Sequence, residues 1–557
     1  MKYRNLTTDE IKKLKENGCS CFENKWEEIK VCNNFDPDKI WHVHFSGWII
    51  IDEGVAIRNI AGGITNCHIK ENAQIENVAR IEFEEEAPCG VGTTVSVLDE
   101  TGTRPVRIYP GISSQMATLI AREPKWFENQ MGPSFQDFLD KFDVPHAIGA
   151  NSIIRDCRRL INVSVGDNVK IEGANSLVNG MIINNSQSSK VVDFIDYGVD
   201  AENFIAEDAY IGANCILRNC YVGQGVSVSN AFTAHDSMFF SNCTFENGEA
   251  CALLAGPYTV SMHKGTLLIG CQTSFMNAGS STNESNHMYK LGPAHWGILE
   301  RGVKTSSGAY IMFGAKIGAF SMVMGQHKTH PDSSSFPFSY LFGDERGATV
   351  IVPGAMLRSC GLMRDEKKWP ARDRRIKKRI PLNDNIIFNV LNPCTVENML
   401  TAIDTITDLL SHPADDDLFV RHKGMKFTRA ALERAKSLYT VAIFKYLSYK
   451  LPELKFPNNN TEKPEDWLDL GGQIIKRTTL AQAMETENPE ETEKIFNLAF
   501  ENYEEDELRW IDARMDSRWR VSPEDILAEA QKFDDMVEED RRDYLENMSR
   551  ENEMLAL

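Results

Sequence analysis

The feature that most constrains this chain is an aliphatic residue that recurs every five or six positions. The series Ile64, Ile69, Ile75 and Ile81 shows the spacing, with small and polar residues between its members. A strand, whose side chains alternate, does not have this period, and neither does a helix. A coil with three short flat sides does, because each side then needs one inward aliphatic residue.

Near-copies of one block support the repeat. Residues 148–157 read Ile-Gly-Ala-Asn-Ser-Ile-Ile-Arg-Asp-Cys, and residues 211–220 read Ile-Gly-Ala-Asn-Cys-Ile-Leu-Arg-Asn-Cys. Gly and Asn suit the corners of a coil, where left-handed backbone angles are needed. Stacked coils pair their backbones and continue one apolar column. We therefore predict a parallel β-helix and expect five aliphatic residues to face its interior, namely Ile148, Ile154, Ile211, Leu217 and Ile317.

Two stretches interrupt the period. Residues 83–144 are predicted to be an insertion, in which residues 95–108 form a hairpin. Residues 113–142 of this insertion should be mostly helical, with a break at Pro133. The repeat also degrades between Ala231 and Pro293, where residues 283–287 indicate a polar loop.

The two ends of the chain have a helical pattern. A short helix is expected over residues 6–17, and longer ones over 395–411, 428–451, 489–514 and 523–553. The predicted fold class is mainly β, with a β-helix, an inserted hairpin and helical segment, and an all-α C-terminal region. Three domains are expected. Residues 1–40 form a helical segment, residues 41–365 form the β-helix with its insertion at about 83–144, and residues 366–557 form the helical region.

Composition excludes some classes of function. The net charge of −20 is concentrated after Ala483, where nine Lys and Arg face 24 Asp and Glu, and such a field repels the phosphates of nucleic acid. No apolar stretch is long enough to span a membrane, and no signal peptide is apparent, so we expect a cytoplasmic protein. The 13 cysteines are scattered beside aliphatic positions, which favours reduced core residues over disulfides.

The spacing and the Ile-Gly-Ala-Asn blocks resemble the hexapeptide-repeat acyltransferase superfamily. That resemblance implies a left-handed parallel β-helix that assembles as a homotrimer. It covers somewhat over half of the chain. The whole pattern, with its helical tail, looks like an uncharacterised family of large bacterial β-helix proteins.

One segment is more specific. Residues 324–331 read Met-Gly-Gln-His-Lys-Thr-His-Pro, and Phe336-Pro337-Phe338-Ser339 and Leu341-Phe342-Gly343 follow. This segment resembles the histidine loop of the xenobiotic acetyltransferases. The resemblance implies that His327, with His330 as the alternative, takes a proton from the acceptor as it attacks acetyl-coenzyme A or another acyl-coenzyme A. A neutral imidazole suits that task near pH 7.

Further residues are candidates for the remaining parts of such a site. Arg374, Arg375 and Lys377 belong to a basic run that could bind the phosphates of coenzyme A. Trp296, Glu300, Phe336 and Phe338 could line the acceptor pocket. A basic run can equally be a solvated linker, and Trp296 and Glu300 can equally be packing residues.

A zinc site is not expected. His42 and His44 share one strand face, and other histidines such as His263, His287 and His295 could join them, but no spacing requires a metal. No tightly bound cofactor is expected. The favoured hypothesis is acyl transfer to a hydroxyl or amine of a sugar-like or small acceptor, without nucleic acid or membrane as partner. The alternative is a non-catalytic β-helix module that binds a sugar nucleotide or a protein.

Overall fold

The computed structural model describes residues 3–285, 291–412, 418–453, 464–518 and 522–555. The chain divides into two compact units, one made of Met1–Ser113, Ile120–Ile269 and Asp373–Asn383, the other of Ser114–Leu119, Gly270–Arg372 and Asp384–Leu557. Both units contain turns of a parallel β-solenoid, about 17 in all. The mainly β fold predicted from the period is therefore confirmed, while the hand of the coil stays a prediction.

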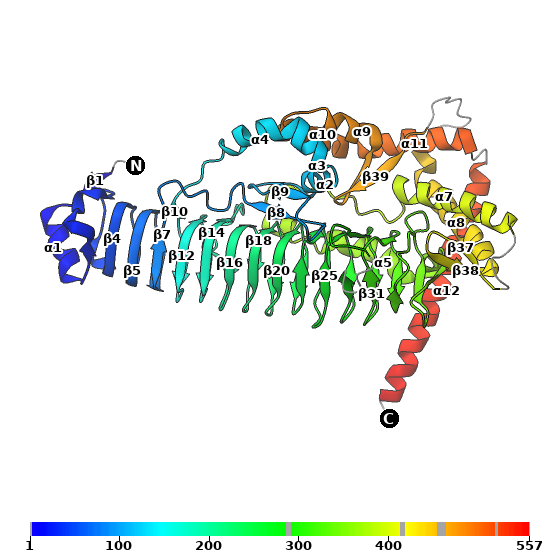
Figure 1. Cartoon of the computed structure of the whole chain (residues 1–557), viewed down its shortest axis with the longest axis horizontal. Coiled ribbons are helices and arrows are strands. Elements are labelled where there is room, and N and C mark those ends of the chain that lie inside the picture. Colours follow the sequence, from blue (N-terminus) through cyan, green and yellow to red (C-terminus); the bar gives the residue numbers. More distant parts are fainter. Residues whose placement is uncertain (1–2, 286–290, 413–417, 454–463, 519–521, 556–557) are drawn as a thin grey trace. The chain divides into compact units, whose positions relative to one another are not determined.

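The solenoid strands of the first unit are short and follow one another closely. They are β1 (Arg4–Asn5), β2 (Ser20–Cys21), β3 (Ile29–Val31), β4 (Ile40–Ile51), β5 (Ala56–Ile69), β6 (Gln74–Val78), β7 (Arg80–Glu82), β10 (Ala147–Ile148), β11 (Ile153–Arg155), β12 (Arg159–Val165), β13 (Val169–Glu172), β14 (Ser176–Ile183), β15 (Val192–Ile195), β16 (Asp200–Glu207), β17 (Tyr210–Ile211), β18 (Ile216–Val222), β19 (Ser227–Ser229), β20 (Thr233–Phe239), β21 (Thr244–Glu246), β22 (Glu249–Cys251), β23 (Leu254–Ala255), β24 (Val260–Ser261) and β25 (Leu267–Ile269). Figure 1 shows them as stacked coils.

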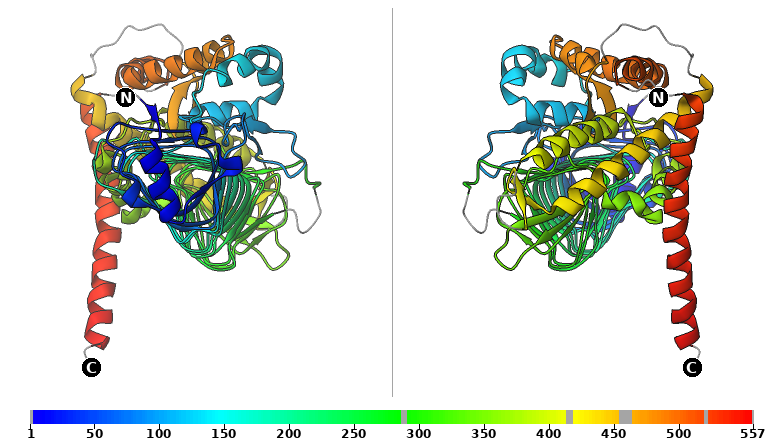
Figure 2. Two further views of the ribbon diagram at one scale, coloured as in Figure 1. Left: turned by 90° about the vertical axis from the view of Figure 1, so that its left-hand side faces the viewer. Right: turned by 90° about the vertical axis from the view of Figure 1, so that its right-hand side faces the viewer.

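Strand register explains the period of the sequence. Ile148 pairs with Val165, and Ile154 with Ile171, in parallel strands of successive coils. One coil therefore takes about 17 residues, the separation of ladder partners such as Asn162 and Asn179. Figure 2, left, looks along the stack and shows the three-sided outline of the coils of the first unit.

The inward positions are those expected. Ile148, Ile154, Ile211 and Leu217 in the first unit, and Ile317 in the second, are each 0% exposed. None of the 13 cysteines, all within the described residues, is in a disulfide, and most of them are buried. Small thiols and aliphatic side chains thus fill the coil together, as predicted.

A ladder of polar side chains runs up one corner of the first unit. The members are Asn162, Asn179, Asn203, Asn219 and Asp236, and each has a positive φ between 47° and 55°. Each asparagine donates a side-chain hydrogen bond to the next member, and Asp236 accepts the last of these bonds. Asn tolerates the left-handed region better than most residues, and its amide both donates and accepts. Asn therefore suits this corner both by its backbone conformation and by its hydrogen bonding.

The insertion has the predicted hairpin. Strands β8 (Thr94–Ser96) and β9 (Pro105–Arg107) pair antiparallel. Its helices are α2 (Ser114–Arg122), whose residues divide between the two units, α3 (Pro124–Trp126), a π-helical turn over Phe127–Met131, and α4 (Gly132–Leu139). The predicted break at Pro133 falls where α4 begins, because this proline occupies the first turn of that helix, where its missing N–H costs nothing.

The coils do not degrade between Ala231 and Ile269. Strands β20 to β25 continue the parallel pairing, and Phe232, Phe239 and Phe245 pack their rings inside the coil, with the last two ring centroids 4.7 Å apart. Bulky aromatic residues replace the aliphatic ones there, which hides the period. Residues 283–285, predicted as part of a polar loop, form strand β28, and His287 lies outside the described residues.

The second unit contains the remaining strands. These are β26 (Cys271–Thr273), β27 (Asn277–Ala278), β28 (Asn283–Ser285), β29 (Gly297–Leu299), β30 (Lys304–Thr305), β31 (Tyr310–Met312), β32 (Lys316–Ile317), β33 (Met322–Met324), β34 (Gln326–His327), β35 (Tyr340–Gly343), β36 (Thr349–Val352), β37 (Val420–His422), β38 (Met425–Phe427), β39 (Trp467–Leu470) and β40 (Gln473–Lys476). Strand β36 turns back antiparallel to β35, which ends the parallel run, and the hairpin β37–β38 joins the edge of β36.

The described helices include those expected from the sequence, together with three that were not predicted, over Cys360–Ala371, Arg374–Lys378 and Arg477–Met484. Outside the insertion, the helices are α1 (Thr8–Glu16) and α6 (Arg374–Lys378) in the first unit, and α5 (Cys360–Ala371), α7 (Pro393–Ser411), α8 (Arg429–Lys450), α9 (Arg477–Met484), α10 (Pro489–Glu501), α11 (Tyr503–Arg518) and α12 (Pro523–Leu555) in the second. The single helix expected over 489–514 is two helices, separated at Asn502. The two C-terminal hairpins were not predicted. No described helix is long and apolar enough to cross a membrane.

Candidate functional site

The histidine loop lies in the last parallel turns of the second unit. Strand β34 pairs with β31, so that His327 stands beside Ile311, an interior position of the preceding coil. His327 is accordingly 0% exposed. Its Nε2–H donates to the carbonyl of Met324 at 3.1 Å, and its Nδ1 lies 2.9 Å from the Thr349 hydroxyl.

This environment fixes the charge of His327. Burial lowers the pKa of the imidazole to about 4, so the ring is neutral near pH 7. Both of its nitrogens are used inside the protein. The sequence favoured His327 as the base, with His330 as the alternative, whereas the geometry makes His327 a core residue.

His330 is placed differently. It is half-buried, with φ of +49°, and its Nδ1 lies 2.5 Å from the carbonyl oxygen of Phe313. Because a carbonyl can only accept, Nδ1 carries the proton and donates it, which leaves Nε2 as the basic nitrogen. A held Nδ1–H and a basic Nε2 are the arrangement that a general base requires.

The hairpin β37–β38 packs beside this loop. Thr329 donates from its hydroxyl to the Gly424 carbonyl at 2.8 Å, and Lys423 lies 3.9 Å from Asp332. A cavity of about 400 Å³ lies here, lined by Thr329, Ala348 and residues 421–426. The loop and the hairpin thus place polar and basic groups around one hollow.

His422 also lines this cavity, and sequence reasoning missed it. Burial, followed by the charge of Lys423, lowers the pKa of His422. Nothing near His422 in the sequence marks it as a neighbour of the histidine loop. Only the pairing of β36 with β38 brings it there.

The aromatic residues predicted for the acceptor pocket belong to the core. Phe336 and Phe338 are both 0% exposed. The Phe336 ring packs 5.2 Å from that of Phe427, and Phe338 stacks on Phe320 at 5.3 Å. Both side chains therefore pack in the interior, next to the histidine loop in the sequence.

Trp296 and Glu300 are placed differently from the two phenylalanines. Both are half-buried. The Trp296 carbonyl accepts from the N–H of Gly314, and a Cβ at Gly314 would lie 3.6 Å from the His330 Nδ1. Glu300 accepts from the Ala319 N–H at 3.1 Å. Trp296 and His330 therefore both border Gly314, while Glu300 holds a turn.

The predicted phosphate-binding residues lie in the first unit. Arg374 donates to the carbonyls of Asn242 and Cys243, and Arg375, only 2% exposed, pairs with Asp373 at 2.9 Å. Burial lowers the pKa of Arg374. Lys377 alone of the three predicted residues is exposed. The two arginines attach their segment to the coils.

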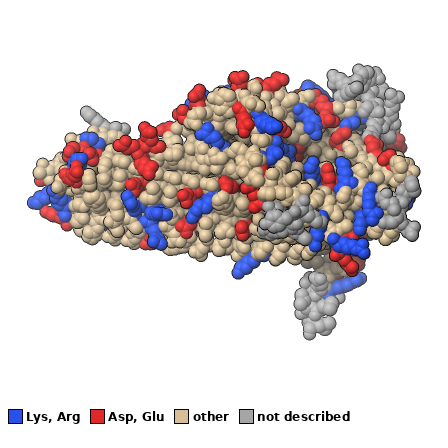
Figure 3. All heavy atoms as spheres, in the orientation of Figure 1, with Lys and Arg blue, Asp and Glu red and all other residues tan. Residues whose placement is uncertain are grey.

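The histidines considered as zinc ligands do not form one cluster among the described residues. His42 contacts Asn59, and His44 contacts Ser20, each through Nδ1. Among the described residues, no group of three or more His, Cys, Asp or Glu is arranged to hold a metal ion. Figure 3 shows acidic and basic side chains interspersed on the visible face, without a large region of one sign.

The model of one family, described as "Domain of unknown function (DUF4954)", matches residues 3–65 and 48–410. The chain belongs to this family. The match covers the solenoid strands and the histidine loop, so the DUF4954 region includes both. The expectation of a large, uncharacterised β-helix family is thereby supported.

A relative in Treponema pallidum (strain Nichols) is named "Uncharacterized protein". It is 23% identical over 470 residues, which are 72% of this chain and 61% of the relative. The chain thus aligns with less than two thirds of that relative's length. Neither this name nor the description of the family assigns an activity.

Proposed function

We propose that the protein transfers an acyl group from coenzyme A to a hydroxyl or amine of a small, sugar-like acceptor, with His330 as general base. The observation that carries the proposal is the hydrogen bond from the His330 Nδ1–H to the Phe313 carbonyl. It holds the ring and leaves Nε2 to take a proton. The resemblance of residues 324–343 to the acetyltransferase histidine loop supports the same role.

The reaction follows from this arrangement. The acceptor oxygen or nitrogen attacks the thioester carbon while Nε2 of His330 removes its proton. The tetrahedral intermediate expels the coenzyme A thiolate, which takes that proton from the imidazolium. The base returns to its starting state, and one acyl bond to sulfur is exchanged for one to oxygen or nitrogen.

His327 serves this proposal as a support. Its neutral ring bridges Met324 and Thr349, and Thr349 lies 3.4 Å from the Thr329 hydroxyl, next to His330. A homotrimer, with the coenzyme between neighbouring β-helices, is part of the proposal because the superfamily resemblance implies it.

The test is transfer of radiolabel from acetyl-coenzyme A to a panel of amino sugars, neutral sugars and small amines. We expect His330→Ala to reduce kcat by about 10²- to 10⁴-fold. The control is His263→Ala, at an exposed histidine of the first unit, which should keep full activity. Wild-type turnover by His330→Ala would show that His330 is not the base.

The second candidate function is a non-catalytic module that binds a sugar nucleotide or a protein. One observation keeps it open: Arg374 and Arg375 are engaged inside the first unit, so they do not supply the phosphate contacts predicted for coenzyme A. Tight binding of a sugar nucleotide in the same experiment, without transfer to any acceptor, would select this function.

A further inference from the structure

A second pocket lies within the C-terminal part of the second unit. It has a volume of about 450 Å³ and is lined by Pro464, Glu465, Trp467, Lys476, Asp506, Arg509, Trp510 and Ala513. Pro464 and Glu465 come from the segment that precedes β39, and strands β39 and β40 and helix α11 supply the other side chains. The volume is typical of pockets that bind small molecules.

The two tryptophans of this pocket have unused donors. Trp467 is 6% exposed and Trp510 is 4% exposed, yet Nε1 of each has no hydrogen-bond partner among the described residues. Buried indole N–H groups normally donate to an acceptor. Trp26 has the same feature within the described residues, but it lies in the first unit. Two such indoles border one pocket, which indicates a ligand that offers acceptor oxygens.

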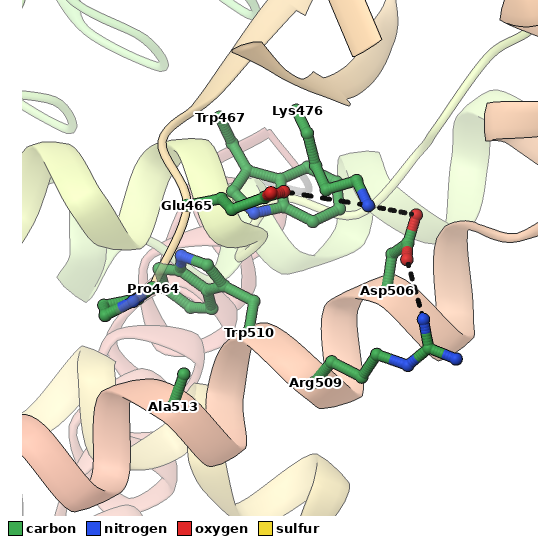
Figure 4. A pocket seen from close by; sticks show the side chains of 8 residues that line it. All are labelled: Pro464, Glu465, Trp467, Lys476, Asp506, Arg509, Trp510 and Ala513. Atoms are coloured by element: carbon green, nitrogen blue, oxygen red, sulfur yellow. Dashed lines mark ion pairs between the residues drawn. The ribbon is translucent and has the colours of Figure 1, made fainter. Parts of the chain in front are cut away.

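The charges of the pocket are already balanced. Lys476 Nζ lies 3.1 Å from Asp506 and 3.7 Å from Glu465, and Arg509 lies 3.9 Å from Asp506. Figure 4 shows the indole rings on one side of the pocket, with Asp506 and Arg509 on the other. Two cations and two carboxylates cancel, so a charged ligand would have to compete with these ion pairs. A neutral polar ligand would instead use them as donors and acceptors.

We propose that this pocket binds a neutral saccharide of mono- or disaccharide size. Such a molecule offers hydroxyl oxygens to the two indole N–H groups and to Lys476. Its hydroxyl protons can be donated to Glu465 and Asp506, and its apolar ring face can pack on an indole. The proposal uses no residue of the histidine loop and does not rest on acyl transfer.

The test is isothermal titration calorimetry of the full chain with N-acetylglucosamine, glucose, cellobiose and glucuronate. Trp467→Phe and Trp510→Phe keep a ring but remove the donor, and each should weaken binding of the tightest neutral sugar about fivefold. Trp26→Phe is the matched control, because it removes an equally buried, unpartnered N–H elsewhere, and it should leave binding unchanged. Glucuronate should bind more weakly than glucose.

Three results would overturn the proposal. They are the absence of binding by every neutral sugar, wild-type affinity in both pocket variants, and tighter binding of glucuronate than of glucose. Circular dichroism verifies that each variant is folded. If either tryptophan variant does not fold, Glu465→Ala replaces it, since that side chain is 44% exposed, and it should again weaken binding about fivefold.

Discussion

Single residues hold the corners of the coils. Asn179 receives a hydrogen bond from Asn162 and donates one to Asn203, with its own φ at 50°. The sequence predicted Asn at corners from its backbone tolerance. It did not predict that the amides would bond to one another, because that depends on which corner each coil presents to the next.

Replacement of Asn179 tests the ladder. Asn179→Ala removes both hydrogen bonds and leaves a methyl group at positive φ, so the free energy of unfolding should fall by about 2–3 kcal/mol. Asn179→Gly also loses both hydrogen bonds but has no backbone strain, so its free energy of unfolding should fall by about 1 kcal/mol less than that of Asn179→Ala. Urea unfolding measures both. Asn129→Ala, at an exposed helical position, is the control, and equal losses in all three variants would contradict the ladder.

The buried His327 makes stability depend on pH. Its pKa is about 4 in the folded protein against 6.5 ordinarily, so the unfolded chain binds the proton first. Stability is therefore complete above pH 6.5 and is lost as the pH falls toward 4, by about 3 kcal/mol from this residue.

His327→Gln removes this titration. The difference in unfolding free energy between wild type and variant, measured from pH 7 to pH 4, should change by about 3 kcal/mol in favour of the variant. The comparison cancels the acid sensitivity of the other groups. Parallel curves for the two proteins would mean that His327 is accessible to protons in the folded state.

At the scale of elements, the hairpin β37–β38 depends on one glycine. Gly424 has φ of +75°, and a Cβ there would lie 2.5 Å from the Thr329 carbonyl oxygen. Gly424→Ala should therefore lower the free energy of unfolding by about 2 kcal/mol or more and accelerate hydrogen exchange in the hairpin.

Gly308→Ala is the matched control for that change. Gly308 has φ of +71°, but a Cβ there would meet nothing within 4 Å. Gly308→Ala should lower the free energy of unfolding only by the backbone strain, about 1 kcal/mol, and leave hydrogen exchange in β37–β38 unchanged. If the two substitutions have equal effects, the hairpin does not rest on the histidine loop.

Some of the helices and strands could be predicted from the sequence, and others could not. The inserted hairpin and most C-terminal helices follow from local turn, cap and period signals. Strands β20 to β25 were missed because aromatic side chains such as Phe239 fill the coil where aliphatic ones were expected. Arg375 was predicted to bind phosphate or to belong to a solvated linker, yet its segment packs against the coils, and that packing has no local signature.

At the scale of the whole molecule, the period determined most of what could be foreseen. Residues such as Ile154 and Leu217 were assigned to the interior because one residue per side must face inward. The candidate site was foreseen only in part. His330 came from a motif, whereas His422 and the indoles of Trp467 and Trp510 are brought into place by long-range packing.

The central claim is that successive coils stack with about 17 residues between neighbours, and disulfide trapping tests it most directly. Ile216 pairs with Thr233, and Thr233 with Glu249, in adjacent parallel strands. Neighbouring strands lie about 4.8 Å apart, within the span of a disulfide, whereas two coils are about twice as far. Under mild oxidation, the account predicts that Ile216→Cys with Thr233→Cys forms a bridge seen by mass spectrometry, and that Ile216→Cys with Glu249→Cys does not. A bridge in the second pair but not the first would contradict the stacking.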